Sequence, residues 1–321
     1  CFKLLFWVLG THYQVKVLKK SLSSGKLDRL LIVNGGYPAG DACLSASIAW
    51  NRLGKNHKAW MNFHNDAAPE SKNIFRKIRG RWLDRLVLKS VEGFVSVSRS
   101  CRDSLETRIE LKHARREFIY NGLKLIEPHK TNSLHEELCI PVESNIILMM
   151  GVYEPRKGHE FIFQVMEKVL KKCSFTHLLV CGYGSSEEME AVENMRKLSK
   201  AEEHIHLHGY RNDMRNLLAQ ANVLVVPSQE YESFGYMALE AMSCQVPVVA
   251  NNVGGLPEVI EDGVSGYILP YNDVQGFADR ILQLLTNLEL VKSMGEAGLQ
   301  RCLKHFTSDR MSKMYADLVR Q

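Results

Sequence analysis

Several familiar patterns are absent from this sequence, and each absence argues against a class of protein. No stretch approaches the roughly 18 consecutive apolar residues of a membrane-spanning helix, so none is predicted. Neither G-x-G-x-x-G nor the Walker pattern occurs, which argues against NAD-binding and P-loop sites. Aromatic residues are not interleaved with the basic residues in a recognisable way, so no nucleic-acid partner is expected.

The cysteines lack the spacing of a metal site or a redox motif. No C-x-x-C occurs among the eight cysteines, and several of them lie in apolar segments. This usage is typical of reduced core thiols in a cytosolic protein. The apolar residues 1–9 form a short stretch that no small-residue cleavage site follows. We interpret them as a helix face packed on the first domain rather than as a signal peptide.

Length and charge divide the chain into two parts. A chain of 321 residues with 45% hydrophobic content is long enough for two domains. Residues 1–143 carry 24 Lys and Arg against 14 Asp and Glu, a net charge of +10. The remaining residues carry 17 against 22, a net charge of −5. The basic first part is therefore expected to meet an anionic partner.

Short apolar blocks alternate with helix-like segments along the chain, and residues 123–144 form a polar, irregular linker. This alternation predicts α/β domains with parallel sheets and right-handed crossovers. The expected strands are 30–33, 58–63, 93–97, 117–120, 145–150, 176–181, 204–208, 223–226 and 244–250. The expected helices are 41–53, 72–89, 99–110, 159–172, 213–220, 235–242 and 273–286, with two more ending near Arg320.

The stretch from 227 to 266 carries the clearest chemical signal. A strand, a polar loop and a helix that opens on Gly235 make a natural anion site, because free N–H groups and the positive helix end face the loop. Glu232 in the loop and Glu240 in the helix suit hydroxyl groups on either side of a phosphate, as in a sugar nucleotide. The alternative interpretation is that Glu232 caps the helix and Glu240 is a solvated helical residue.

The same stretch closely resembles the retaining glycosyltransferases of family 4. Looser matches to that family continue through most of the chain, and the densest part of the resemblance is 145–321. The ordered motifs are E-x7-E from Glu232 to Glu240 with Phe234-Gly235 inside it, PVVA at 247–250, GG-x-x-E at 254–258 and DG-x-x-G at 262–266. The looser matches are Tyr120-Asn-Gly122, Lys157-Gly158, Gly182-Tyr-Gly184 and His208-Gly209.

The fold implied by this resemblance is α/β of the GT-B type, with two Rossmann-like domains facing each other across a cleft. The implied first, acceptor-side domain with its linker is 1–143, and the nucleotide-sugar-binding domain is 144–305. Residues 306–321 form a terminal helix that crosses back to the first domain. The family's first βα units and their glycine-rich acceptor loop are missing, and the chain begins with Cys1. We therefore expect a fragment with an incomplete first domain rather than a trimmed one.

The resemblance also implies a set of site residues and a retaining transfer that requires no metal. Lys157, the backbone near Gly235 and the helix dipole would stabilise the leaving diphosphate, and Glu240 would bind the ribose. The family's usual G-R-x is replaced by Gly151-Val152, so Arg156 is the candidate substitute. The implied catalytic residues are His64, Glu232 and Lys157. The implied nucleotide-sugar-binding residues are Arg156, Gly182, Tyr210, Ser233, Phe234, Gly235 and Glu240.

Two further features leave alternatives open. His204, His206 and His208 would share one face of a strand, but no carboxylate or cysteine ligand is apparent nearby, so a metal is not expected. The basic helix 72–89 is either a solvated surface or a binding face for an anionic membrane or a charged glycan. Its apolar face, made by Ile74, Ile78, Trp82 and Leu86, is expected to pack inward.

The predicted function is transfer of a sugar from a nucleotide-diphosphate sugar, UDP or GDP most of all, to a glycan, lipid or other acceptor. The expected setting is cytoplasmic polysaccharide or lipopolysaccharide biosynthesis, with peripheral attachment to the inner face of the cell membrane through 72–89. The alternatives are a GT-B sugar-nucleotide epimerase and an inactive, truncated nucleotide-binding protein.

Overall fold

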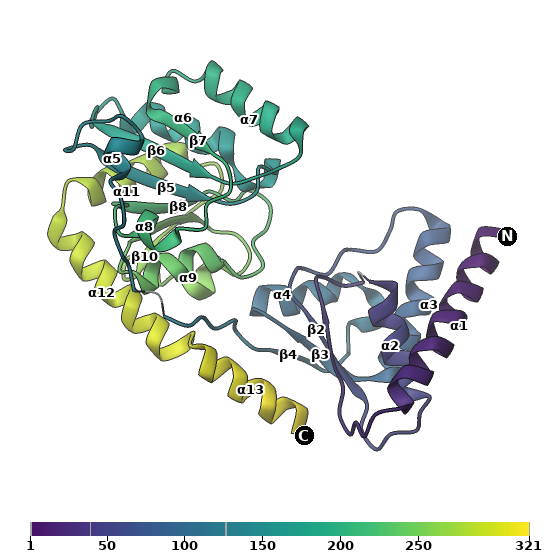
Figure 1. The fold of residues 1–321 in the computed structure, drawn as a ribbon. Helices are drawn as coiled ribbons and strands as arrows, with labels where there is room; N and C mark the ends of the chain where they lie inside the picture. The colour runs from purple at the N-terminus through teal and green to yellow at the C-terminus, as the bar shows by residue number, and fades with distance from the viewer. Residues whose placement is uncertain (1, 39, 126, 321) are drawn as a thin grey trace. The chain divides into compact units, whose positions relative to one another are not determined.

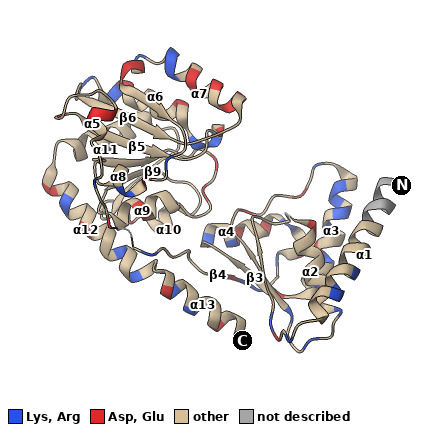
Figure 2. Cartoon of the chain, in the orientation of Figure 1, with Lys and Arg blue, Asp and Glu red and all other residues tan. Residues whose placement is uncertain are grey.

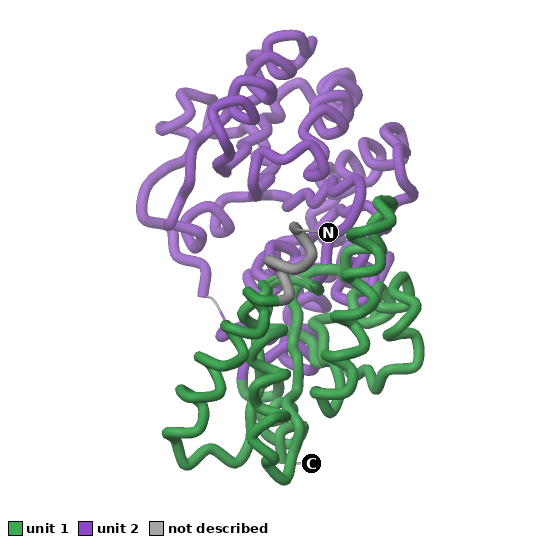
Figure 3. The backbone as a smooth tube through the Cα atoms, turned by 90° about the vertical axis from the view of Figure 1, so that its right-hand side faces the viewer, with its two compact units in different colours: residues 1–121, 309–321 green, residues 122–308 purple. Residues whose placement is uncertain are grey.

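The computed structural model describes residues 2–38, 40–125 and 127–320, with side chains from residue 9 onward, and it separates into two compact units (Figure 3). Unit 1 comprises residues 1–121 and 309–321, and unit 2 comprises residues 122–308. The segment 122–143, which the sequence placed with the first domain, is therefore counted with unit 2. None of the helices described is both long enough and apolar enough to cross a membrane.

Unit 1 contains a four-stranded sheet in the order β1-β2-β3-β4, with every pairing parallel (Figure 1). Its strands are β1 Leu31–Asn34, β2 Ala59–Phe63, β3 Val91–Ser96 and β4 Arg116–Phe118. Its helices are α1 Phe2–Ser23, α2 Asp41–Asn51, α3 Ile74–Ser90, α4 Arg99–Asp103 and α13 Ser308–Arg320. The predicted parallel sheet of this part of the chain is confirmed.

The last helix belongs to the core of unit 1. Leu318 of α13 packs with Trp60, Val95 and Ile119 in one buried cluster. Inside β2, Asn62 donates its side-chain amide to the Val95 carbonyl at 3.1 Å and to the Tyr315 hydroxyl at 2.8 Å. A buried amide in an otherwise apolar strand is thereby satisfied from both sides.

Helix α4 of unit 1 is shorter than expected. The helix expected at 99–110 ends at Asp103 and continues as 3₁₀ turns at 104–107 and 109–111. Arg108, between these two turns, forms a 2.9 Å ion pair with the buried Asp84 of α3. α1 packs through Val15 on α2, while Leu9 is exposed. The expected packing of residues 1–8 lies outside the described side chains.

The orientation predicted for α3 is wrong for three of its four apolar residues, whereas Leu86 packs inward, against the cluster around Val15, as expected. Ile74, Ile78 and Trp82 are 60%, 57% and 39% exposed, and neighbouring Phe75 is 74% exposed. The helix is buried mainly through Leu83 and Val87, each of which follows a residue of the predicted face by one position. The sequence carries two apolar stripes on this helix, and periodicity alone does not choose between them. Figure 2 shows Lys and Arg distributed along α3 as well.

Unit 2 contains a six-stranded parallel sheet in the order β10-β9-β8-β5-β6-β7. Its strands are β5 Asn145–Met150, β6 Thr176–Cys181, β7 Ile205–His208, β8 Val223–Val226, β9 Val248–Asn251 and β10 Gly266–Leu269. Its helices are α5 Leu134–Glu137, α6 His159–Val169, α7 Ser186–Leu198, α8 Met214–Leu218, α9 Tyr236–Ser243, α10 Leu256–Val259, α11 Val274–Leu285 and α12 Leu288–His305.

The strand order of unit 2 locates its ligand edge. β5 pairs with β6 on one side and with β8 on the other. The strands after β5 are therefore added in one direction as far as β7 and in the opposite direction from β8 onward, so the order of the sheet switches between β5 and β8. In open α/β sheets, ligands bind outside the carboxyl ends of the strands at such a point. The loops 151–158 and 227–235 follow these two strands. The predicted α/β class, with two Rossmann-like parallel sheets of the GT-B kind, is confirmed.

Candidate functional site

The two loops at the carboxyl ends of β5 and β8 are bonded to each other. Gly158 has a φ of +79°, and a Cβ there would lie 2.1 Å from the Pro227 carbonyl oxygen, so only glycine fits. The Gln229 N–H donates to the Arg156 carbonyl at 2.7 Å. This close contact places the Lys157 side chain, from the first loop, beside the second.

Lys157 and Glu232 form the central charged pair of these loops. The Lys157 Nζ lies 2.6 Å from Glu232 Oε2, and both side chains are largely buried. The Ser228 hydroxyl donates to the same oxygen at 3.1 Å. Glu232 therefore does not cap α9, whose first turn begins after Gly235 with no side-chain cap. That finding rules out the capping alternative.

The double glycine of the third loop holds the backbone of Glu232. Gly254 has a φ of +55°, and a Cβ on it would lie 2.1 Å from the Glu232 carbonyl oxygen. The Gly255 N–H donates to that same oxygen at 2.7 Å. A Cβ on Gly255 would come within 2.7 Å of the Ser233 carbonyl oxygen. The motif thus acts by close backbone packing, which fixes the position of Glu232.

The start of α9 combines an open backbone with a buried ring. Gly235 has a φ of +101°, a conformation that L side chains rarely adopt. Ser233 and Phe234 are both buried. The Phe234 ring packs edge-on against Phe306, with 5.9 Å between the ring centroids, so its side chain belongs to the core. At Ser233, Phe234 and Gly235, we therefore expect an anion to be bound by backbone N–H groups at the start of α9 rather than by side chains.

Glu240 lies one and a half turns into α9 and has an unusual environment. Its Oε2 is buried and has no hydrogen-bond partner. Burial raises the pKa of the Glu240 carboxyl above its ordinary value. Nearly all buried polar atoms in native proteins are paired, so this oxygen is an unusual buried acceptor. Glu240 is not the solvated residue of the alternative interpretation.

Three other predicted residues surround these loops. Arg156 pairs with Glu154, and its guanidinium lies 4.6 Å from the centroid of the Tyr231 ring. A Cβ on Gly182 would lie 1.8 Å from the Gly151 carbonyl oxygen, so glycine is required where these loops meet. Tyr210 is exposed, and its ring lies 6.2 Å from that of Tyr183.

His64 is the one predicted site residue of unit 1. It directly follows β2, and its N–H donates to the Asn34 carbonyl at the end of β1, at 3.1 Å. Burial lowers the pKa of His64, which favours the neutral imidazole. A neutral ring at the carboxyl edge of a parallel sheet can accept or donate one hydrogen bond to a ligand.

Two of the three histidines that were expected on one strand form a cluster: His206 lies on β7, and His204 ends the 3₁₀ turn before it. The rings of His204 and His206 lie 4.7 and 5.2 Å from the ring of His177 on β6, a residue that the sequence analysis did not single out. His177 Nδ1 and His206 Nε2 are 3.0 Å apart, within hydrogen-bond distance. Across residues 2–38, 40–125 and 127–320, no group of three or more His, Cys, Asp or Glu is arranged to hold a metal.

Sequence reasoning missed two residues that support the second loop. Ser228 bonds the carboxylate of Glu232. Asn251, fully buried at the end of β9, donates its side-chain amide to the carbonyls of Pro227 and Ser228, each at 3.2 Å. The sequence signal for Asn251 was its position as a polar residue at the end of an apolar strand.

Comparisons with known proteins identify the family to which the chain belongs. Residues 130–301 match the family described as glycosyl transferases group 1. The N-acetyl-alpha-D-glucosaminyl L-malate synthase of Bacillus anthracis is 30% identical over 182 residues, which are 57% of this chain and 47% of that relative. An uncharacterised glycosyltransferase of Methanocaldococcus jannaschii is 27% identical over 291 residues, 90% of this chain and 75% of that relative.

Solved structures show the same fold at low sequence identity. A glycosyltransferase from Rickettsia africae has a TM-score of 0.78 and 20% identity, covering 96% of this chain and 80% of that one. Anabaena HepE, solved in complex with UDP and glucose, has a TM-score of 0.76 and 19% identity. That match covers 96% of this chain and 81% of HepE.

Proposed function

The chain belongs to the glycosyl transferases group 1 family, and we propose that it moves a sugar from a nucleotide-diphosphate sugar to a glycan or lipid-linked acceptor with retention of anomeric configuration. The observation that carries this proposal is the orphaned, buried Oε2 of Glu240. It lies in the helix whose uncapped start suits a diphosphate. A ribose hydroxyl would satisfy that oxygen.

In the proposed mechanism, the main task of the chain is to stabilise negative charge on the leaving diphosphate. Lys157 and the start of α9 supply positive charge at the same edge of the sheet, with Arg156 adjacent. Lys157 is paired with Glu232 in the structure. A bound diphosphate would compete for Lys157 and free the Glu232 carboxylate to accept hydroxyls of the donor sugar. His64 is proposed to contact that sugar near the reaction centre.

No metal has a role in this proposal. Lys157 and the α9 terminus carry the charge that a divalent cation would otherwise supply. UDP and GDP are the proposed donor nucleotides, and HepE, solved with UDP and glucose, supports the first of them. The proposed acceptor belongs to surface polysaccharide or lipopolysaccharide assembly.

We further propose that α3 attaches unit 1 to an anionic membrane at the cytoplasmic face. Its first turns expose Ile74, Phe75 and Ile78. Lys72 and Arg76 lie within the same short stretch, whereas Arg81 and Arg85 are bonded to Glu70 and Glu110. Exposed apolar side chains flanked by basic ones are typical of helices that lie in a membrane interface. A lipid-linked acceptor would be reached from that position.

The test of the proposed transfer uses the whole chain with radiolabelled UDP- and GDP-sugars and a panel of lipid-linked and oligosaccharide acceptors. We expect labelled acceptor and free nucleoside diphosphate in equal amounts, with the new linkage in the donor's anomeric configuration by NMR. Excess chelator should leave the rate unchanged. Inversion of configuration would refute retention, and a strict Mg²⁺ or Mn²⁺ requirement would refute the metal-free proposal. An altered free sugar nucleotide would instead indicate an epimerase.

A further inference from the structure

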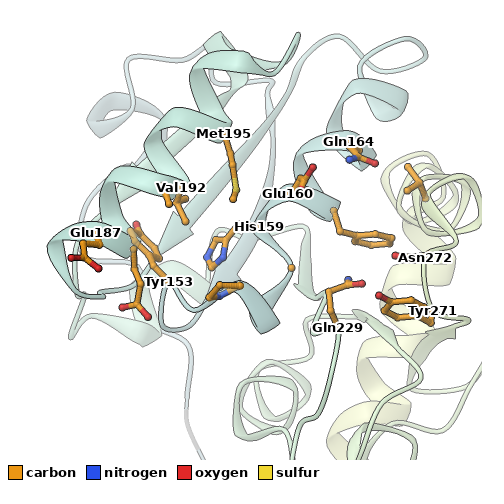
Figure 4. Close-up of a pocket in the computed structure, with 16 residues that line it drawn as sticks. Tyr153, His159, Glu160, Gln164, Glu187, Val192, Met195, Gln229, Tyr271 and Asn272 are labelled. Carbon is orange, nitrogen blue, oxygen red and sulfur yellow. The ribbon is translucent and has the colours of Figure 1, made fainter.

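A cavity lies in unit 2, and none of the residues proposed to bind the nucleotide sugar is among those that line it. It has a volume of about 610 Å³ and is lined by α6, α7, the loop after β10 and Gln229 (Figure 4). Tyr153, Pro155 and Gly158 of the loop after β5 also line it. That volume falls within the usual range for small-molecule sites. Of the donor residues proposed above, none lines this cavity among the described side chains. The two sites therefore use different side chains.

His159, the first residue of α6, faces this cavity and has unmet hydrogen-bonding capacity (Figure 4). It is only 2% exposed, and neither ring nitrogen has a hydrogen-bond partner. Its ring is held edge-on against Tyr153, with 5.2 Å between centroids. Because buried polar groups are nearly always paired, two orphaned nitrogens on one ring indicate a partner that occupies the cavity.

The charge state of His159 narrows the chemistry of that partner. Burial, with a smaller contribution from the nearby Lys157 charge, lowers the pKa of His159 to about 4. The ring is therefore neutral near pH 7, with one N–H donor and one acceptor nitrogen. A hydroxyl group both donates and accepts, so a ligand with several hydroxyls satisfies both nitrogens.

The rest of the lining disfavours an anionic ligand and offers both polar and apolar groups. No Lys or Arg is among the described residues that line the cavity, which disfavours phosphates and carboxylates. Gln164, Gln229 and Asn272 supply amides, and Glu160, Glu187 and Glu188 supply carboxylates, which accept hydrogen bonds from hydroxyl groups. Gln229 is fixed by a 2.7 Å bond to the Pro227 carbonyl. Tyr271, 59% exposed at the cavity, offers an aromatic face.

We propose that this cavity is a saccharide-binding site, separate from the donor site, in which His159 and the amides bind sugar hydroxyls and Tyr271 packs on the apolar face of the ring. The proposal does not depend on the donor or on retention. Water is the rival occupant, because a cavity of this size and polarity also holds solvent.

The test follows the His159 imidazole by NMR in the whole chain, with its resonances assigned by their loss in His159→Phe. Glucose, N-acetylglucosamine and maltose are the probes. We expect at least one of them to shift the His159 signals saturably, both with and without UDP present. Affinity is measured independently from saturation transfer to the sugar. His159→Phe and Gln164→Leu should each weaken binding about tenfold, the effect of losing a hydrogen bond.

Matched variants separate this site from general effects. Tyr271→Ala should weaken saccharide binding, whereas Phe175→Ala, at a similarly exposed (57%) aromatic residue outside the cavity lining, should not. Glu240→Ala should leave saccharide binding unchanged. A failure of the proposed donor site can therefore be distinguished from a failure of the proposed saccharide site. Absence of any shift at His159 up to the solubility limit of all three sugars would mean that water fills the cavity. Equal saccharide affinity in wild type and Gln164→Leu would also overturn the proposal. If His159→Phe does not fold, the result with Gln164→Leu alone tests the proposal.

Discussion

At the scale of single residues, the two glutamates of the E-x7-E spacing have opposite surroundings. Glu232 is paired with Lys157 and Ser228, whereas Glu240 has a buried oxygen with no partner. The protein itself satisfies the carboxylate of Glu232, whereas no hydrogen bond within the chain offsets the desolvation of Glu240 Oε2. Donor binding should therefore give Glu240 Oε2 a hydrogen bond and replace Lys157 by sugar hydroxyls as the partner of Glu232.

We predict that Glu240→Ala weakens nucleotide binding by about 1.5–3 kcal/mol, the usual contribution of hydrogen bonds to a charged group. Stability should be unchanged or higher, because the substitution removes a buried polar oxygen without breaking a side-chain bond. Titration calorimetry with UDP and GDP measures the first effect, and thermal unfolding measures the second. Glu190→Ala, at an exposed carboxylate of α7, is the control. Unchanged nucleotide affinity in Glu240→Ala would exclude the ribose contact.

The site was only partly predictable from the residues themselves. The spacing of Glu232, Gly235 and Glu240 is local, so the sequence indicated a loop-to-helix anion site. The bond between Lys157 and Glu232 joins residues 75 positions apart. The orphaned nitrogens of His159 depend on how α6 and α7 enclose a cavity. Such features arise from tertiary packing, which no local pattern encodes.

At the scale of elements, the strands were the most predictable part of the fold. Parallel strands buried on both faces form continuous apolar blocks, such as 145–150 and 223–226, and these stand out in any sequence. α7 was missed because it is mostly polar, although its Ser185 and Glu188 form a capping box. The orientation of α3 was mistaken because two apolar stripes compete on one helix.

The exposed face of α3 leads to a prediction about membranes. The variant Ile74→Ser/Phe75→Ser/Ile78→Ser and the variant Lys72→Glu/Arg76→Glu should each weaken binding to phosphatidylglycerol-containing vesicles. The second loss should reach about tenfold or more, because each basic residue near an anionic surface contributes to attachment. Vesicle co-sedimentation measures both. Arg52→Glu/Lys58→Glu makes the same charge change at exposed positions elsewhere in unit 1 and should bind like wild type.

Equal binding to neutral and anionic vesicles, or no binding to either, would contradict the attachment. Added salt should weaken the interaction only in part, because the Debye length is about 8 Å at physiological ionic strength while the apolar contribution is not screened. Complete loss of binding in salt would mean that Ile74, Phe75 and Ile78 do not enter the bilayer.

At the scale of the whole molecule, buried histidines make stability depend on pH. Burial lowers the pKa of both His159 and His177 to about 4, and for His177 the neighbouring histidines add to the effect. In the unfolded chain each regains an ordinary pKa near 6.5, so the unfolded state binds more protons between these values. The stabilisation is complete above about pH 6.5 and is lost as pH falls toward about 4.

We predict a slope in the free energy of unfolding of about 1.4 kcal/mol per pH unit for each of these histidines across that window. Urea denaturation at a series of pH values, followed by circular dichroism, measures it. His177→Phe keeps a ring against His204 and His206 and should remove one such contribution. The exposed His113→Phe is the control. An unaltered slope in His177→Phe would show that His177 becomes protonated in the folded state.

The membership of α13 in unit 1 has a consequence for synthesis on the ribosome. Trp60, Val95 and Ile119 are made early, but Leu318, which completes their cluster, emerges only after the whole of unit 2. Unit 2 is one continuous stretch and can fold as soon as it leaves the exit tunnel, since domains generally fold as units during translation. Unit 1 cannot complete this cluster until α13 is synthesised, so part of its sheet stays uncovered until then. The nascent chain is therefore expected to fold its second unit first, and to need chaperone protection over the β2–β3 face until α13 arrives.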